Sequence, residues 1–125
     1  MKSFIYHAPK DVKDASKLAS SSSAFLAGGM TTIPSMKLGL ATYKDVIDIK
    51  NIKKLSGIKL SGKSVTIGAT TKHVEVATSK DVKKAIPALA KLAGNIGDAQ
   101  VRNRGTIGGS ISNNDPSACY PSACM

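Results

Sequence analysis

The sequence predicts a mixed α and β fold in two parts, and three observations indicate it. Residues 4–49 alternate strand-like and helix-like segments in the order β-α-β-α-β, typical of a small layered α/β unit ending near Lys54. Residues 57–67 then carry a hairpin pattern, and helix-like segments follow it. A length of 125 residues with 42% apolar content suits a single globular unit.

The chain is expected to start with two strands and a helix between them. Residues 4–6 are apolar or aromatic and predict a short strand, which Pro9 ends. Asp11 suits a helix N-cap, because its carboxylate can accept from free amides of the first turn. Apolar residues follow it at helical spacing: Val12, Ala15, Leu18 and Ala19. Residues 24–27 predict a brief buried strand that leads directly into two glycines.

A second helix and a third strand complete the first part. Thr31 or Thr32 can cap this helix, and Pro34 falls in its first turn, where the missing N–H costs nothing. Residues 46–49, Val-Ile-Asp-Ile, predict the third strand.

The second part begins with a hairpin and continues as helices. Residues 57–60 and 64–67 alternate with period two, and Ser-Gly-Lys at 61–63 makes the turn. Residues 71–78 and 81–86 predict two short helical pieces.

Pro87 is expected to open a longer helix whose apolar residues share one face. These residues are Leu89, Leu92, Ala93 and Ile96. Residues 98–109 show little apolar periodicity and are expected to form a loop, and Asp115-Pro116 is expected to start a final helix.

The charge balance is strongly basic, with 18 Lys and Arg against 8 Asp and Glu and a formal net charge of +10. Only Arg102 and Arg104 are arginines and there is no Trp, so forked phosphate contacts and stacking platforms are scarce. This composition disfavours nucleic-acid binding, but a basic field can attract an anionic cofactor. A small basic α/β module that binds polyanions without catalysis is the alternative interpretation.

Neither a catalytic side chain nor a metal site is predicted. His7, His73, Cys119 and Cys124 lack the paired spacing of a structural zinc site, and no nucleophile and base stand in a recognisable pattern. No apolar run approaches the roughly 20 residues of a membrane span, and no signal-like stretch opens the chain. The sequence therefore predicts a cytoplasmic protein without a membrane span.

The first segment that suggests chemistry is a glycine turn between the second strand and the second helix. Its residues are Ala27, Gly28, Gly29, Met30, Thr31 and Thr32. Consecutive amides in such a turn form an anion-binding nest, so a pyrophosphate is a natural ligand. The segment lacks the Gly-Lys-Ser/Thr of a Walker loop and the third glycine of a Rossmann fingerprint. On its own it is more typical of a plain turn than of a ligand site.

A second glycine-rich segment spans residues 100–110. It combines both arginines with three glycines in five residues, and Asn113, Asn114 and Asp115 follow. Side-chain donors and bare backbone amides in one segment suit a ligand that bears phosphate or a ribityl chain. A surface loop that needs its glycines only for turning is the other interpretation.

Together these segments resemble the FAD-binding medium subunits of molybdenum hydroxylases, of the carbon monoxide dehydrogenase and xanthine dehydrogenase type. The resemblance rests on Leu-Ala-Gly-Gly-Met-Thr at 26–31 and Arg-Asn-Arg-Gly-Thr-Ile-Gly-Gly-Ser at 102–110. Shorter matches lie at residues 4–9, 36–37, 48–49, 67–69 and 114–116. The similarity therefore extends over nearly the whole chain, in the same order.

The resemblance implies an α+β, two-subdomain FAD-binding domain of the vanillyl-alcohol-oxidase (PCMH) type, with the second subdomain incomplete. Residues 1–56 would form the first subdomain and residues 57–125 the start of the second. The first glycine turn, Ala27 to Thr32, would hold the FAD pyrophosphate. The implied contacts from the other subdomain are Thr106, Ile107, Gly108, Gly109, Ser110 and Asp115.

The resemblance also implies the protein's partners and its place in electron transfer. A molybdopterin-containing large subunit would oxidise the substrate, and a [2Fe-2S] small subunit would pass electrons to FAD. The flavin would deliver them to an external acceptor, a role that requires no side-chain acid or base.

Two departures from the family pattern qualify these expectations. Family members often carry an acidic residue at the position of Cys119, so Cys119 is not counted among the cofactor ligands. The family's flavin subunit also continues well beyond Met125. We therefore expect an amino-terminal fragment, from a truncated reading frame or a split subunit, that binds FAD poorly alone; a relic without activity is the remaining alternative.

Overall fold

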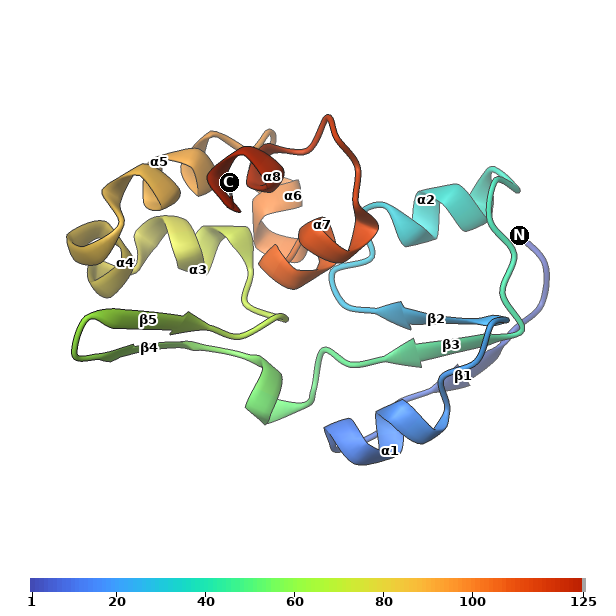
Figure 1. The fold of residues 1–125 in the computed structure, drawn as a ribbon. Helices are drawn as coiled ribbons and strands as arrows, with labels where there is room; N and C mark the ends of the chain where they lie inside the picture. The colour runs from blue at the N-terminus through green and yellow to red at the C-terminus, as the bar shows by residue number, and fades with distance from the viewer. Residues whose placement is uncertain (125) are drawn as a thin grey trace.

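The computed structural model describes residues 1–124 and has an α+β fold with two small sheets (Figure 1). The two sheets are formed by the first half of the chain, and the helices of the second half pack mainly on the sheet nearer to them in sequence, the two-stranded one (Figure 1). The strands are β1 (Ile5–His7), β2 (Ser23–Leu26), β3 (Asp45–Asp48), β4 (Ile58–Ser61) and β5 (Ser64–Ile67). The helices are α1 (Val12–Lys17), α2 (Thr32–Lys37), α3 (His73–Thr78), α4 (Lys80–Ala85), α5 (Pro87–Asn95), α6 (Ala99–Arg104), α7 (Ile107–Asn113) and α8 (Cys119–Cys124), with a 3-10 turn, η1, at Lys53–Leu55.

The first sheet is parallel and has the order β1-β3-β2. Parallel strands need crossover connections: α1 connects the two outer strands β1 and β2, α2 connects the neighbours β2 and β3, and the two helices lie on opposite sides of the sheet (Figure 1). As the central strand, β3 is the most buried, and Ile47 is fully buried against Ala15 of α1 and Ile52. This arrangement places the carboxyl end of β2, and the glycine turn after it, at the edge nearest the second half of the chain.

The predicted caps of the first two helices differ in outcome. Asp11 caps α1 as expected, since its Oδ1 accepts from the N–H of Asp14 at 2.8 Å. Thr31 precedes α2, but its side chain makes no capping bond. The amides at the start of α2 are therefore not satisfied by their own cap residue.

The second half is built around a core shared by the β4–β5 hairpin and the helices that cover it. Ile58 pairs with Ile67 and Leu60 with Val65, which places these apolar side chains on one face of the hairpin. The buried residues of this core are Val76, Val82, Ala90, Ala93 and Tyr120. Pro87 is the first residue of α5, as the sequence predicts.

The expected loop over residues 98–109 is wrong, because this segment forms α6 and most of the first turn of α7. Each helix has a polar cap: Asp98 accepts from the N–H of Val101 at 3.0 Å, and Thr106 from that of Gly109 at 3.2 Å. Both helices are short and no residue of either is fully buried, so no apolar period marks them in the sequence. The final helix begins at Cys119, four residues later than expected from Asp115.

Truncation of the β3 core residue tests the sheet packing. Ile47→Ala should lower the free energy of unfolding by about 2–5 kcal/mol, because the cavity left beneath β3 cannot be filled by water at little cost. Ile5→Ala is the matched control in the same sheet, since Ile5 is 62% exposed and Ile47 is 0% exposed. Urea denaturation followed by circular dichroism measures both, and equal losses would contradict this packing.

A buried histidine makes the stability of the second half depend on pH. His73, the first residue of α3, is 5% exposed, and burial lowers its pKa below the usual value of about 6.5. The unfolded chain takes up this proton at a higher pH than the folded chain does. Stability is therefore fully present above about pH 6.5 and is lost as the pH falls toward the folded pKa.

The expected result is a free energy of unfolding that decreases between about pH 7.5 and pH 5. The variant His73→Gln should show a flatter profile over that interval, measured by urea denaturation at several pH values. An unchanged slope in this variant would show that another group titrates there.

Candidate functional site

A cavity of about 530 Å³ lies where the end of β2 meets the helices of the second half. Its volume falls within the roughly 300–1,000 Å³ typical of small-molecule sites. The position, outside the carboxyl ends of parallel strands, is the usual place for a ligand in such sheets. Eleven of the twelve predicted cofactor-binding residues line it: Ala27, Gly28, Gly29, Met30, Thr31, Thr32, Thr106, Gly108, Gly109, Ser110 and Asp115.

The first glycine turn presents a row of unused backbone donors. Within the described residues 1–124, the N–H groups of residues 28–32 have no hydrogen-bond acceptor. The carbonyls of Gly29 and Thr31 do accept, from Ile33 and Ser35 of α2 at 3.1 Å each, so the turn is held in place. Gly29 has φ +75°, a conformation that favours glycine. Free amides beside a glycine of positive φ are the elements from which anion-binding nests are built.

A backbone contact joins this turn to the second glycine-rich segment. A Cβ on Gly28 would collide with the carbonyl oxygen of Arg104 and lie 2.7 Å from the Cα of Gly105. Glycine is therefore required at position 28 by the close approach of the two segments, although its φ is not positive. Figure 1 shows the consequence: the β2–α2 connection runs beside α6 and α7.

The second segment differs from expectation, because its amides are already used within the fold. Ile107 donates to the carbonyl of Thr71 at 3.1 Å, and Gly108 to that of Ala69 at 2.9 Å. The N–H groups of Gly109 and Ser110 both bond to Thr106, at 3.2 and 3.0 Å. This segment forms a wall of the cavity rather than a second row of free donors.

The wall is held in place by the packing of Gly108 and Ile107. A Cβ on Gly108 would lie 2.6 Å from the carbonyl oxygen of Ala69, so only glycine permits this contact. Ile107 is the one predicted site residue that does not line the cavity, since its side chain packs against the Val76 core. Arg102, expected among the side-chain donors, donates instead to the carbonyl of Ile96 at 2.6 Å.

The cavity includes residues that sequence reasoning did not select. Phe25 and Tyr43 offer aromatic surface, and His73 and Cys119 offer polar groups. The remaining lining residues are Ala24, Ile49, Ala69, Ile96, Val101, Gly105, Ser112, Asn113 and Ala118. Val101, Gly105 and Asn113 lie in or beside the second glycine-rich segment, but most of the others are apolar or small and come from elements far apart in the chain, which no single local pattern marks. Cys119 lines the cavity although it was set aside as a ligand.

A buried carboxylate lies at the carboxyl end of β3, beside the strand that leads into the turn. Asp48 accepts from the Tyr6 hydroxyl at 2.6 Å and pairs with Lys50 Nζ at 2.8 Å. Burial alone raises the pKa of Asp48, but the bonds from Lys50 and Tyr6 outweigh it and hold this pKa below its usual value. The same Asp48–Lys50 pair raises the pKa of Lys50, against a smaller opposing effect from the positive charge of Arg104.

Two further observations concern metal and membrane. No group of three or more His, Cys, Asp and Glu side chains within residues 1–124 is placed to hold a metal ion. Among these same residues, no helix is long and apolar enough to cross a membrane.

Comparison with known proteins places the chain in a family. The family described as FAD binding domain in molybdopterin dehydrogenase matches residues 2–125. The carbon monoxide dehydrogenase medium chain of Hydrogenophaga pseudoflava is 44% identical over 121 residues, which are 94% of this chain and 42% of that protein. The glyceraldehyde dehydrogenase medium chain of Sulfolobus acidocaldarius is 41% identical over 96 residues, 77% of this chain and 34% of that protein.

Solved structures show the same likeness in three dimensions. Carbon monoxide dehydrogenase from Hydrogenophaga pseudoflava matches with a TM-score of 0.94 at 44% identity, over 96% of this chain and 43% of that chain. Quinoline 2-oxidoreductase from Pseudomonas putida matches with a TM-score of 0.88 at 30% identity, over 94% and 42% of the two chains. The chain thus spans less than half the length of these relatives. It belongs to the FAD-binding domain family of molybdopterin dehydrogenases, the family that its two glycine-rich segments resemble.

Proposed function

We propose that FAD lies in the cavity between the β2–α2 turn and α7, with its diphosphate on the free amides of residues 28–32. The main support for this proposal is the row of backbone N–H groups that have no acceptor within the described residues. The oxygens of a diphosphate would accept hydrogen bonds from them. Gly28 lets the turn close against the backbone of Arg104 and Gly105, and Gly29 supplies the positive φ that the turn needs. The residues present therefore fit the cofactor of the family.

The predicted ligands divide into two sets with different tasks. Residues 27–32 would bind the diphosphate through backbone donors. Thr106, Gly108, Gly109, Ser110 and Asp115 would shape the opposite wall, where their hydroxyl and carboxylate groups suit the hydroxyls of a ribityl chain. Ile107 would act indirectly, because its core contacts hold that wall in place. The division of the chain into residues 1–56 and 57–125 fits this arrangement and stays a prediction.

We further propose that the chain is the FAD-binding part of a molybdenum-containing hydroxylase or dehydrogenase. Relatives named as medium chains support a partnership with a molybdopterin-containing large subunit and a [2Fe-2S] small subunit. Bound FAD would supply two-electron redox chemistry between the iron–sulfur subunit and an external acceptor. The chain's own residues would bind and orient the cofactor and exclude water from it. A cytoplasmic location stays a prediction.

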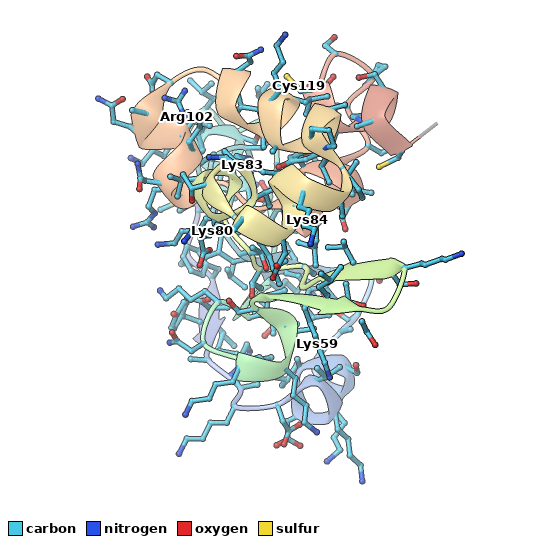
Figure 2. All side chains as sticks on the ribbon, turned by 90° about the vertical axis from the view of Figure 1, so that its left-hand side faces the viewer. Lys59, Lys80, Lys83, Lys84, Arg102 and Cys119 are labelled. Carbon is cyan, nitrogen blue, oxygen red and sulfur yellow. The ribbon has the colours of Figure 1, made fainter. Side chains whose placement is uncertain are left out.

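A second candidate function rests on a basic surface away from the cavity. Figure 2 shows Lys80, Lys83 and Lys84 of α4 together with Lys59 of β4 on the end of the molecule formed by α4, α5 and the hairpin. Within the described residues, none of the four forms a salt bridge. A polyanion-binding module would use this surface, whereas a flavin domain would use the β2–α2 turn.

Titration of the purified chain with FAD separates the two functions. We expect saturable binding, seen as a change in flavin fluorescence, with low affinity because the chain spans 42% of its relative's length. Binding of duplex DNA should be weaker still and should fall steeply between about 50 and 200 mM salt. Saturable DNA binding without any FAD binding would favour the polyanion module.

A substitution in the turn tests the placement of the diphosphate. Gly29→Val should abolish measurable FAD binding, because its Cβ would lie 2.7 Å from the Ile33 Cδ1 atom and 3.2 Å from the Leu26 Cδ1 atom, so the turn and its free amides would have to shift. Gly39→Val is the matched control: Gly39 has the same φ of +75°, has nothing within 4 Å of an added Cβ and does not line the cavity. Both variants carry the same backbone strain of about 1–2 kcal/mol. Equal FAD affinity in the Gly29 and Gly39 variants would show that the β2–α2 turn does not bind the diphosphate.

A further inference from the structure

The phenyl and phenol surface of the cavity lies on one side of the β2–α2 turn. Of the phenylalanines and tyrosines within residues 1–124, Phe25 and Tyr43 line the cavity. Phe25 belongs to β2, an edge strand in the sheet order β1-β3-β2, and Tyr43 lies in the connection from α2 to β3. Figure 1 shows the turn between α7 on one side and β2 with α2 on the other. Both rings therefore belong to the side of the cavity formed by the sheet.

These two rings are open to a ligand in different ways. Phe25 is 49% exposed although it borders a cavity, so much of its ring is left uncovered by the fold. Tyr43 is half-buried. Its hydroxyl has no hydrogen-bond partner within residues 1–124, whereas the hydroxyls of Tyr6 and Tyr120 each bond to a side chain of the fold. The sheet side thus offers flat apolar surface and one unused hydroxyl.

The backbone on either side of Tyr43 is held by hydrogen bonds to other elements. The Leu40 N–H donates to the carbonyl of Ser35 in α2 at 2.9 Å. The Lys44 N–H donates to the carbonyl of Ser22, the residue before β2, at 2.8 Å. The connection that carries Tyr43 is therefore fixed to both α2 and the start of β2, which reduces the entropy lost when a ligand covers the ring.

The two sides of the turn differ in chemistry, as the two halves of a dinucleotide do. The α7 side carries hydroxyl and carboxylate groups, which suit the several hydroxyls of a ribityl chain. A purine base is flat and gains most from stacking on aromatic rings. The reverse placement would set the ribityl hydroxyls against Ala24, Phe25 and Ile49, whose side chains have no hydrogen-bonding group. The chemistry therefore favours one orientation of the ligand.

The spacing along β2 agrees with this orientation. Phe25 lies three residues before Gly28, which is roughly 10 Å along an extended chain. A nucleoside attached to a phosphate on the turn is long enough to bring its base to that ring.

We propose that Phe25 and Tyr43 form the subsite for the adenine ring, so that the adenosine half of the dinucleotide lies against β2 and the flavin half lies against α7. The proposal rests on FAD occupying the cavity as proposed above. The two rings bind the base through stacking and apolar contact, and the Tyr43 hydroxyl is available to the base or its ribose. The residues thus determine which half of FAD lies on each side of the turn.

The first test compares FAD with ADP, which shares the diphosphate and adenosine but lacks the flavin. Flavin fluorescence gives the FAD dissociation constant of the full chain, and displacement of FAD gives that of ADP. Tyr43→Ala and Phe25→Leu should each weaken FAD and ADP by the same factor, about tenfold, because each removes a stacking ring. Tyr43→Phe keeps the ring and should retain most of the affinity. Leu40→Ala is the matched control, since Leu40 is 79% exposed on the same connection and does not line the cavity.

The second test uses the wild-type chain and the fluorescence of FAD itself. In free FAD the adenine stacks on the isoalloxazine ring and quenches its fluorescence. A subsite that holds the adenine apart from the flavin should therefore raise the fluorescence of FAD on binding. A flavin ring stacked on Tyr43 would instead be quenched further, which would overturn the proposed orientation.

The outcomes separate this proposal from the flavin function. Weaker FAD binding in Tyr43→Ala with unchanged ADP binding would place the flavin half on the sheet side and overturn the adenine subsite. Wild-type FAD affinity in both Tyr43→Ala and Phe25→Leu would also overturn it, and either result leaves FAD binding in the cavity intact. Absence of FAD binding in the wild type would overturn both proposals.

Discussion

The cavity exists because the loop after β2 and the end of α6 meet backbone to backbone. Gly28 and Gly105 have no side chains, and a single methyl group on Gly28 would separate the two segments. Since β2 belongs to the parallel sheet and α6 to the helical half, this contact also fixes how the two halves are placed against each other. Packing density leaves no room to widen the junction without moving whole elements. A side chain at Gly28 or Gly105 would therefore disturb both the packing of the two halves and the cavity between them.

The two glycine-rich segments have opposite hydrogen-bonding states, although their sequences look alike. In the β2–α2 turn, the amides of residues 28–32 are left free, while Gly28 serves the close contact with α6 and Gly29 supplies the positive φ of the turn. In the wall formed by residues 106–110, the amides bond to Ala69, Thr71 and Thr106, and Gly108 serves packing against Ala69. One segment thus has free donors and the other is a fixed wall that faces it across the cavity, a division that would preorganise the binding proposed above.

Prediction from sequence succeeded where the signal is local and failed where it is shared between distant residues. The strands, the hairpin and the helices up to residue 95 follow from spacing, turn residues and caps, and the FAD-binding family follows from two motifs. The helices α6 and α7 were missed because their stability comes from polar caps and from contacts with residues 69–73, not from an apolar stripe. Ile107 illustrates the same limit: the motif contains it, but its side chain turns into the core.

The sequence by itself determined the mixed α and β composition, the cap at Asp11, the start of α5 at Pro87 and the presence of a glycine turn at Gly28-Gly29. Each of these depends on residues a few positions apart, whose conformational preferences act before any packing. Only the tertiary structure decided the strand order, which amides stay free and that His73 borders the cavity. These features arise from contacts between segments tens of residues apart, and the energy of such contacts depends on the three-dimensional arrangement rather than on any local pattern.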